Sequence, residues 1–442
     1  MARKRAAPGR LQAWKAWLAQ LKAAQIAAVV GLTLAVILVF LNLTGSGRRI
    51  EHPIPHRYAT ADPQFSRTMG NLLGPAFVPG NRVATLLNGD QVFPAMLEAI
   101  RSARHTITFE TYIYWKSDIG AKFAEALAER ARAGVRTHLL LDWVGAEKMD
   151  GKQLEQMQKA GVEIVSYRPL RWYNLDRLNH RTHRKLLIVD GRVGFTGGVG
   201  IADQWLGHAQ DKDHWRDSHF RVEGPVAAQL QAAFMDDWLE TEGVVLDGAG
   251  YFPPLDSVGP QRAQAFHSSP AGGSESLRLM YLLAIASASR NILIANAYFV
   301  PDRMTVDMLV AARRRGVDVE ILVPGKILDA QLVRRASRGT WGPLLEAGVR
   351  IYEYQPTMYH VKVMVVDDLW ASVGSTNFDD RSFRLNQEAN LNVLDAAFAE
   401  EQARVFASDR ARGRRVTPEE WKRRPVWERL EEWVAAALRR QL

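Results

Sequence analysis

The chain has 442 residues, of which 47% are hydrophobic and 24% charged. This composition is that of an ordinary globular protein, and it excludes a chain that is disordered over most of its length. The length exceeds that of a typical single domain, so we expect two domains or two fused halves. The formal net charge of +9 favours an anionic partner, either nucleic acid or an anionic lipid surface. The absence of cysteine excludes disulfides, thiolate metal ligands and a cysteine nucleophile.

The first feature in chain order is an apolar stretch near the N-terminus. No charged residue occurs between Lys22 and Arg48, and the residues from Ile26 to Leu43 are almost all apolar. At about 1.5 Å per residue, a helix of this length crosses the roughly 30 Å of a bilayer core. We therefore predict a transmembrane helix at residues 23–45. A buried core helix and a cleaved signal peptide are the alternatives.

Basic residues predominate before this stretch. Six Lys or Arg side chains lie within residues 1–22, against three within residues 48–57. By the positive-inside rule, this asymmetry places the N-terminus in the cytosol and the rest of the chain on the outer side of the membrane.

After residue 50 the chain alternates short apolar runs with segments of helical period, which is typical of α/β units around a mostly parallel sheet. The order strand, helix, strand at residues 104–142 recurs at residues 290–323. The segment AlaGlyValGluIleValSerTyr ending at Tyr167 and the segment AlaGlyValArgIleTyrGluTyr ending at Tyr354 agree in five of eight positions. We therefore predict an internally duplicated α/β fold, whose two halves have mixed, mostly parallel sheets.

The predicted organisation has six parts. A stretch rich in Pro, Gly and Ser after residue 250 separates the two halves and is interpreted as a linker. The parts are a basic cytosolic N-terminus at 1–22, the membrane span at 23–45, a first half at 50–250, the linker at 251–273, a second half at 274–410 and a basic amphipathic helical segment at 411–442.

Both halves carry the same rare pattern within an apolar, β-branched run. The two copies are His183-x-Lys185-x4-Asp190 and His360-x-Lys362-x4-Asp367. Alternation along a strand projects each histidine and its lysine to one face, whereas each aspartate points the other way. Two histidines and two lysines around one centre would form a cationic pocket suited to a phosphate. The aspartates are grouped with this motif, and we expect them to have a mainly structural role, tethering the strand end or a lysine.

Seven residues beyond each aspartate comes a turn of small residues. The turns are Gly197-Gly198-Val199-Gly200 and Gly374-Ser375-Thr376-Asn377. Such turns let the backbone and small polar groups approach an anion closely. Gly198, Ser375 and Asn377 are therefore candidate ligands for a phosphate.

The two HxKxxxxD motifs with their turns resemble those of the phospholipase D superfamily. More narrowly, four further segments resemble the bacterial cardiolipin synthases: PheGluThrTyrIleTyr at 109–114, HisTrpArgAsp at 214–217, GluGlyPro at 223–225 and GlySerThrAsnPheAspAspArgSer at 374–382. The resemblance implies a duplicated phospholipase D fold with one active site shared by the halves. One departure is Gly200, where the family often has asparagine, so the first half is expected to supply one phosphate contact fewer.

The resemblance also implies roles for the side chains. His183 is assigned as the nucleophile that forms a phosphohistidine, and His360 as the general acid and then the base; the reverse assignment is the alternative. Lys185 and Lys362 would hold the phosphoryl oxygens. Each histidine needs an acceptor on its other ring nitrogen, and superfamily members of this kind place an acidic residue some tens of positions after each motif. The candidates are Asp217 for His183 and Glu388 for His360, with surface salt bridges as the alternative. Glu110 is a weaker candidate for the rim of the site.

No cofactor and no metal are expected, because the lysines supply the charge that a metal would bring. The resemblance implies that the enzyme transfers a phosphatidyl group from one phosphatidylglycerol to another, with release of glycerol, at the bacterial inner membrane. Phospholipid and membrane are the expected partners, nucleic acid is not, and the oligomeric state stays open. A hydrolytic phospholipase D, a membrane-tethered nuclease and an inactive lipid-binding scaffold are the alternatives.

Apolar residues near the C-terminus recur at helical spacing beside basic residues. They are Trp427, Leu430, Trp433, Val434 and Leu438. We expect this helix to lie either on the bilayer or against the catalytic core.

Overall fold

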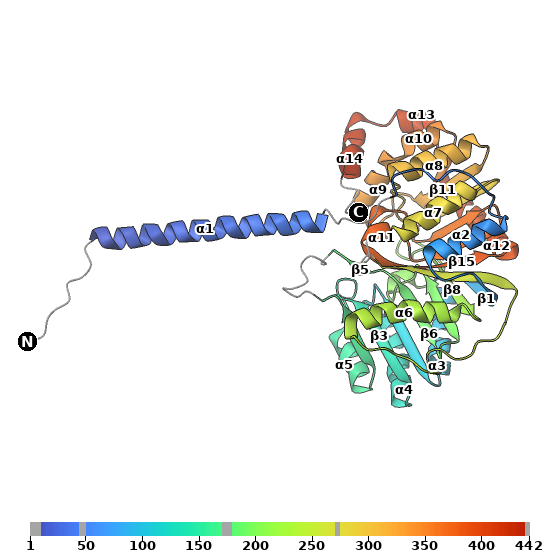
Figure 1. Cartoon of the computed structure of the whole chain (residues 1–442), viewed down its shortest axis with the longest axis horizontal. Helices are drawn as coiled ribbons and strands as arrows, with labels where there is room; N and C mark the ends of the chain where they lie inside the picture. The colour runs from blue at the N-terminus through green and yellow to red at the C-terminus, as the bar shows by residue number, and fades with distance from the viewer. Residues whose placement is uncertain (1–9, 44–49, 170–178, 270–274, 438–442) are drawn as a thin grey trace, which may run out of the picture. The chain divides into compact units, whose positions relative to one another are not determined.

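The computed structural model describes residues 10–43, 50–169, 179–269 and 275–437 (Figure 1). The chain divides into two compact units, one of Met1–Ser46 with Leu170–Asn179 and the other of Gly47–Pro169 with His180–Leu442. The described part of the first unit is essentially one long helix, α1 (Arg10–Leu43). Among the described residues, no helix is long and apolar enough to cross a membrane. The last two residues of the predicted span, 44 and 45, lie outside the described residues.

The second unit is built on one mixed sheet. Its sixteen described strands follow the order β16-β12-β11-β10-β13-β14-β15-β9-β1-β8-β7-β6-β2-β3-β4, with β5 paired to β15 beside this path. The strands are β1 (Val78–Leu87), β2 (Thr106–Thr111), β3 (Arg136–Asp142), β4 (Glu163–Tyr167), β5 (Arg181–Thr182), β6 (Lys185–Val189), β7 (Val193–Gly197), β8 (Ser218–Glu223), β9 (Gln261–Ser268), β10 (Asn291–Asn296), β11 (Asp318–Pro324), β12 (Arg350–Tyr354), β13 (Lys362–Val366), β14 (Trp370–Gly374), β15 (Asn386–Leu394) and β16 (Gly413–Val416).

Helices connect the strands and cover the sheet (Figure 1). They are α2 (Pro63–Leu73), α3 (Asn88–Ser102), α4 (Asp118–Arg132), α5 (Gly151–Lys159), α6 (Ala227–Glu242), α7 (Ser276–Ser287), α8 (Arg303–Arg314), α9 (Gln331–Gly339), α10 (Trp341–Glu346), α11 (Asp380–Arg384), α12 (Ala396–Ala411), α13 (Pro418–Lys422) and α14 (Val426–Ala437). Corresponding helices begin alike in the two halves: the Ser117 side chain caps α4 and the Asp302 side chain caps α8.

The strand order confirms the predicted duplication. The parallel strands β2, β3 and β4 continue through the antiparallel strands β6, β7 and β8, and β10, β11 and β12 continue in the same way through β13, β14 and β15. The prediction of mostly parallel sheets was wrong, because antiparallel pairs predominate. The pattern of strand, helix and strand accounts for the parallel strands alone, whereas β6–β7 and β13–β14 follow one another through short hairpins, which pair antiparallel.

The stretch at 251–273 is more than the linker that we predicted. It contains β9, which pairs with β15 on one side and β1 on the other and so joins the two halves. Its Ala263 and Ala265 side chains are buried at the centre of the sheet. The sequence of β9 is rich in small and polar residues, so it gives little strand signal. The strand lies in the core because β1 and β15 pair with it on both sides. Residues 270–273 lie outside the described residues.

The predicted boundary at residue 410 is also corrected. Helix α12 continues to Ala411, and β16 pairs with β12, so the C-terminal segment extends the sheet of the second half. The strand Gly413-Arg414-Arg415-Val416 has only four residues, too few to show alternation, which is why the sequence did not indicate a strand there. Residues 438–442, including Leu438 of the predicted amphipathic face, lie outside the described residues.

One hydrophobic core is common to both halves. It contains Leu186 of β6 and Val363 of β13, which occupy matching positions, together with Ala263 of β9. Helices α6 and α12 contribute Phe234 and Phe398 to the same core. Burial of apolar surface therefore holds the two halves together as one compact unit.

Asp190 and Asp367 tie strand ends together. Each lies just after β6 or β13, at the opposite end of the strand from the motif's histidine, and adopts a positive φ of 53° or 58°. Their carboxylates accept backbone N–H groups at 2.6–3.2 Å from Arg104, His105 and Thr106 for Asp190, and from Ser289, Arg290 and Asn291 for Asp367. Grouping the aspartates with the catalytic side chains is therefore corrected: they tether the starts of β2 and β10, as strand alternation indicated, and neither tethers a lysine.

Candidate active site

The histidines and lysines of the two motifs are buried at matching positions. His183 and His360 are 8% and 5% exposed, and Lys185 and Lys362, at the starts of β6 and β13, are 3% and 4% exposed. Each lysine Nζ donates to the carbonyl oxygen of its own histidine at 2.7 Å. The Nζ of Lys362 also lies 3.2 Å from both ring nitrogens of His360. Buried ammonium groups beside imidazoles are uncommon without a function.

Each histidine binds a carboxylate from the other half of the chain. His183 Nδ1 donates to both carboxylate oxygens of Glu388, each at 3.0 Å. His360 Nδ1 donates to Asp217 Oδ2 at 2.7 Å. The predicted pairs, Asp217 with His183 and Glu388 with His360, were wrong. Both carboxylates do contact a motif histidine, but Glu388 contacts His183 and Asp217 contacts His360.

Backbone pairing between the halves explains the contact of His183. Strand β5 pairs in parallel with β15, with Thr182 opposite Gln387. The N–H of His183 then donates to the carbonyl of Gln387 at 2.8 Å. Glu388 is the next residue, so the same pairing that fixes the His183 backbone delivers its carboxylate.

The contact of His360 has the same origin. Arg216 pairs with Tyr359, and the N–H of His360 donates to the carbonyl of Arg216 at 2.8 Å. Asp217 is the next residue. Arg216 is itself held by the carboxylate of Asp409, at 2.9 Å from Nε and 2.8 Å from the second guanidinium nitrogen. The short sequence distance from each histidine to the next carboxylate suggested pairs within each half. Sequence distance does not show that strands from opposite halves bring the carboxylates together with the histidines.

The two carboxylates are kept anionic by different donors. Glu388 accepts the hydroxyls of Ser375 at 2.5 Å and Ser382 at 2.7 Å. Asp217 accepts the indole N–H of Trp205 at 2.9 Å. Burial acts to raise the pKa of each carboxyl, but the facing histidine and the nearby lysine hold both pKa values below their ordinary range.

The small-residue turns place the carboxylates. A Cβ on Gly198 would lie 2.3 Å from Asp217 Oδ1, so glycine leaves the room that Asp217 occupies. Ser375, at the matching position, instead donates to Glu388. The N–H groups of Gly198 and Ser375 donate to strand carbonyls at 3.1 and 3.0 Å, so the prediction that these residues bind phosphate is corrected. Asn377 is 5% exposed, and its side-chain N–H groups could donate to a phosphate, so it stays a candidate ligand.

The four basic side chains form one electrostatic site. Burial lowers the pKa of His183 to about 4, Glu388 opposes this, and Lys185 and Lys362 add to it. Burial lowers the pKa of Lys185 to about 7 and that of Lys362 to about 8. Burial and Lys362 also lower the pKa of His360. A lysine of one half thus acts on a histidine of the other, and a phosphodiester anion between them would stabilise their charged forms.

Two tyrosines that were not predicted from the sequence lie against the histidines. Tyr112 lies edge-on to His183, with ring centroids 5.3 Å apart, and Tyr298 lies edge-on to His360 at 6.4 Å. The Tyr298 hydroxyl donates to Asp329 at 2.7 Å. A signal existed, because the two tyrosines follow the corresponding strands β2 and β10.

Glu110 does not lie at the rim. Its side chain is fully buried and accepts the hydroxyl of Thr182, next to the buried ion pair of Arg184 and Asp237. Burial and Asp237 raise the pKa of Glu110 well above its ordinary value. Glu110 therefore holds Thr182 of β5 in place from within the core. Within the described ranges, no group of three or more His, Cys, Asp and Glu side chains is arranged to hold a metal ion.

Residues 96–238 and 281–410 match the family model described as cardiolipin synthase, PLD-like domain. Each matched segment contains one of the two motifs. The chain is 35% identical over 373 residues to cardiolipin synthase 1 of Bacillus anthracis, covering 82% of this chain and 73% of that protein. The major cardiolipin synthase of Bacillus subtilis (strain 168) is 36% identical over 366 residues, covering 82% and 76%. The chain belongs to the cardiolipin synthase family of phospholipase D-like proteins.

Solved structures agree with this fold. The crystal structure of phosphatidylserine synthase from Haemophilus influenzae Rd KW20 matches with a TM-score of 0.66 and 15% sequence identity, covering 86% of this chain and 99% of that one. A similarity at this level of identity concerns the fold, and it confirms the duplicated phospholipase D-like architecture predicted from the sequence.

The crossed contacts predict how each carboxylate acts. We expect Glu388→Gln and Asp217→Asn each to lower kcat on a phospholipid substrate by about 10²- to 10⁴-fold, because the imidazole loses the acceptor that fixes its tautomer. Carbethoxylation followed by mass spectrometry measures the modification rate of each histidine separately. Glu388→Gln should change the modification rate of His183 alone, and Asp217→Asn that of His360 alone. The opposite pattern would contradict the crossed pairs.

Proposed function

We propose that this protein is a cardiolipin synthase, which transfers a phosphatidyl group from one phosphatidylglycerol to a hydroxyl of another and releases glycerol. The observation that carries the proposal is the pair of crossed contacts, His183 with Glu388 and His360 with Asp217, beside two buried lysines. Each carboxylate accepts the Nδ1 proton of its histidine. The Nε2 of neutral His183 is therefore available to attack, whereas the Nε2 of protonated His360 carries the proton that the leaving group takes. Membership of the family supports the choice of substrate.

In the first step, the Nε2 of His183 attacks the phosphorus of one phosphatidylglycerol. The bond between phosphorus and the glycerol headgroup oxygen breaks, and His360 donates the proton that the leaving alkoxide needs. The products of this step are glycerol and a phosphatidyl group bonded to His183. Lys185, Lys362 and Asn377 hold the phosphoryl oxygens, whose charge they stabilise as it grows.

In the second step, a hydroxyl of another phosphatidylglycerol attacks the same phosphorus. His360, now neutral, takes the hydroxyl proton while the bond between phosphorus and nitrogen breaks. Cardiolipin leaves, and both histidines return to their starting protonation states. Water in place of the second lipid would give phosphatidic acid, which is the hydrolase alternative.

We also propose that residues 23–45 span the bacterial inner membrane once, with residues 1–22 in the cytosol and the catalytic halves, within 50–250 and 274–410, on the outer face. The support is the absence of charge between Lys22 and Arg48 and the greater number of basic residues before this stretch. Helix α1 is continuous through most of it.

Product analysis tests the function. The full-length protein in detergent, with phosphatidylglycerol as the only lipid, should yield cardiolipin and glycerol by mass spectrometry, and His183→Ala should yield neither. Because His183 is the attacking group, this loss should be complete rather than partial. Phosphatidic acid alone would show a hydrolase, and no lipid turnover would favour a nuclease or an inactive scaffold.

A substrate with a good leaving group separates the roles of the histidines. Phosphatidyl-p-nitrophenol needs no proton on departure, so His360→Ala should release nitrophenol once and accumulate a phosphatidyl group on His183. His183→Ala should release none. Peptide mass spectrometry under neutral conditions locates the adduct. An adduct on His360 in His183→Ala would establish the reverse assignment.

The lysine pKa values predict the pH dependence. Lys185 and Lys362 lose their protons as the pH rises through about 7 and about 8 in the empty site, so kcat/KM, which reports the free enzyme, should fall above this range. A bound phosphodiester raises both pKa values, so kcat should fall only at higher pH. His183, with a pKa of about 4, stays neutral above that pH. A kcat/KM that stays constant from pH 7 to about 10 would contradict this.

The membrane orientation is tested by labelling. The chain has no cysteine, so Leu72→Cys, at an exposed position of α2, gives a single reactive thiol. A membrane-impermeant maleimide should label it in intact spheroplasts. Labelling only after lysis would place the catalytic halves in the cytosol.

A further inference from the structure

Helix α14 docks on the protein through its polar face. Glu432 is 3% exposed and Ala435 is fully buried. The Glu432 carboxylate accepts Arg338 Nε of α9 at 2.8 Å and Arg424 Nε at 2.7 Å. Arg335 of α9 adds an ion pair to Glu431 at 3.3 Å. Ion pairs and one small side chain therefore hold this helix in place.

The opposite face of α14 carries large apolar side chains that are exposed to solvent. Their exposed fractions range from 47% to 79%, and their helical spacing places them in one stripe: Val426, Trp427, Leu430, Trp433 and Val434. A helix that served only to pack on the core would bury these residues and expose its glutamates. The polarity of α14 is the reverse, which is typical of a helix whose apolar face meets a partner.

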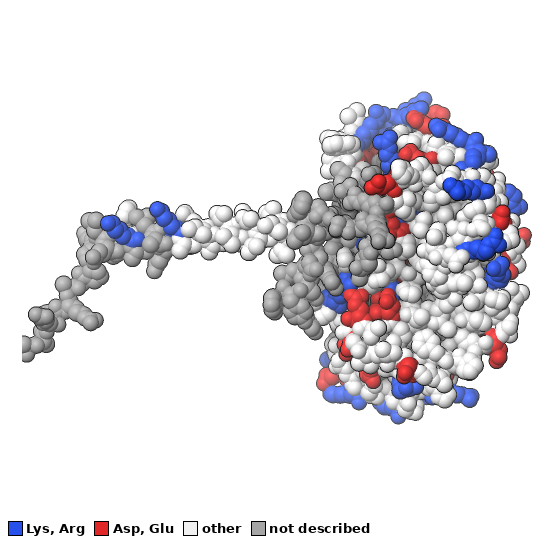
Figure 2. Space-filling view, in the orientation of Figure 1, with Lys and Arg blue, Asp and Glu red and all other residues white. Residues whose placement is uncertain are grey.

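Basic side chains line a groove that reaches one end of the stripe, at Trp427. This groove of about 620 Å³ between α9 and α14 is lined by six of them, Lys326, Arg334, Arg335, Arg338, Arg414 and Arg424, against four glutamates. Figure 2 shows a largely uncharged surface at α14 with Lys and Arg side chains beside it. Surfaces that bind at the interface of an anionic bilayer typically combine tryptophan, leucine and valine with arginine.

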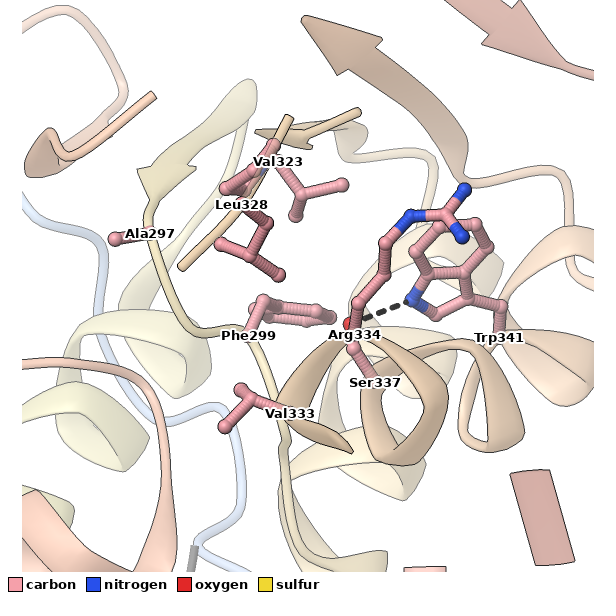
Figure 3. A pocket seen from close by; sticks show the side chains of 9 residues that line it. Ala297, Phe299, Val323, Leu328, Val333, Arg334, Ser337 and Trp341 are labelled. Atoms are coloured by element: carbon pink, nitrogen blue, oxygen red, sulfur yellow. Dashed lines mark hydrogen bonds between the residues drawn. The ribbon is translucent and has the colours of Figure 1, made fainter. Parts of the chain in front are cut away.

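The docking face of α14 is linked to the surroundings of the active site through α9. Ala435 of α14 packs in a small apolar cluster with Val333 and Ala336 of α9 and with Val300, and Tyr298, which faces His360, borders this cluster. Figure 3 shows the neighbouring side of α9, where its side chains meet those of the segment after β10 around a small pocket. In Figure 1, α14 lies at the same side of its unit as β5 and α11, which adjoin the site.

We propose that the apolar stripe of α14, with the basic groove beside it, is a bilayer-docking surface that seats on an anionic phospholipid membrane and brings the active site to its substrate. The choice of partner rests on the proposed lipid function, but docking does not require turnover. The indoles and Leu430 enter the interfacial layer, and the groove faces the phosphate headgroups.

Site-directed spin labelling tests this surface directly. Because the chain has no cysteine, Leu430→Cys and Trp433→Cys each carry a single nitroxide. Leu72→Cys on α2 is the matched control, since Leu72 and Leu430 are 58% and 61% exposed. The full-length protein, in the His183→Ala background so that lipid is not consumed, is reconstituted in vesicles of phosphatidylglycerol and phosphatidylcholine.

We expect nitroxides at 430 and 433 to collide readily with oxygen, which is enriched in the bilayer. Their collision rate with an aqueous nickel complex should be lower than that of the Leu72 label by about fivefold or more. Labels at 430 and 433 that are as accessible to nickel as the control would overturn the proposal. Labels shielded from both reagents would also overturn it, because they would show contact with protein, either a second copy or another part of the chain. None of these outcomes depends on catalytic activity.

A kinetic measurement connects the surface to lipid access. The double variant Leu430→Asp with Trp433→Asp should raise the apparent KM for phosphatidylglycerol in vesicles by about tenfold, and leave turnover of short-chain phosphatidylglycerol in micelles unchanged. Leu72→Asp should change neither. An equal loss on both substrates would indicate a damaged fold and contradict a docking role.

Discussion

The structure depends on one constraint, that each motif histidine is bound by a carboxylate from the other half of the chain. Glu388 holds the Nδ1 of His183, and Asp217 holds that of His360. Both contacts follow from backbone pairing across the halves, in which the residue before each carboxylate accepts the N–H of the opposite histidine. Neither half can therefore build a competent imidazole alone, which gives the duplicated chain a physical reason to fold as one unit around one site.

The same arrangement explains the electrostatics. Two lysines and two histidines are buried together, and burial lowers the pKa of all four. Lys362 further lowers the pKa of His183, His360 and Lys185, and Lys185 that of His183. Two carboxylates offset part of this positive charge. A phosphodiester anion supplies the rest, so substrate binding and the protonation of the site favour each other.

The sequence predicted the duplication, the paired motifs and both orienting carboxylates, because each leaves a local pattern of alternation, spacing or resemblance. It did not predict which carboxylate meets which histidine, because that depends on strands from opposite halves. Nor did it predict β9, whose small and polar residues are buried by their neighbours, or the antiparallel hairpins. Gly198 and Ser375 were taken for phosphate ligands because a turn of small residues looks the same whether it faces an anion or a carboxylate of the protein.

A structure with orthovanadate bound, as a mimic of the phosphoryl group, would test the shared site most directly. The account predicts vanadium bonded to the Nε2 of one motif histidine, with Lys185 and Lys362 from the two halves on the same anion. A vanadate held by the residues of one half alone would contradict it.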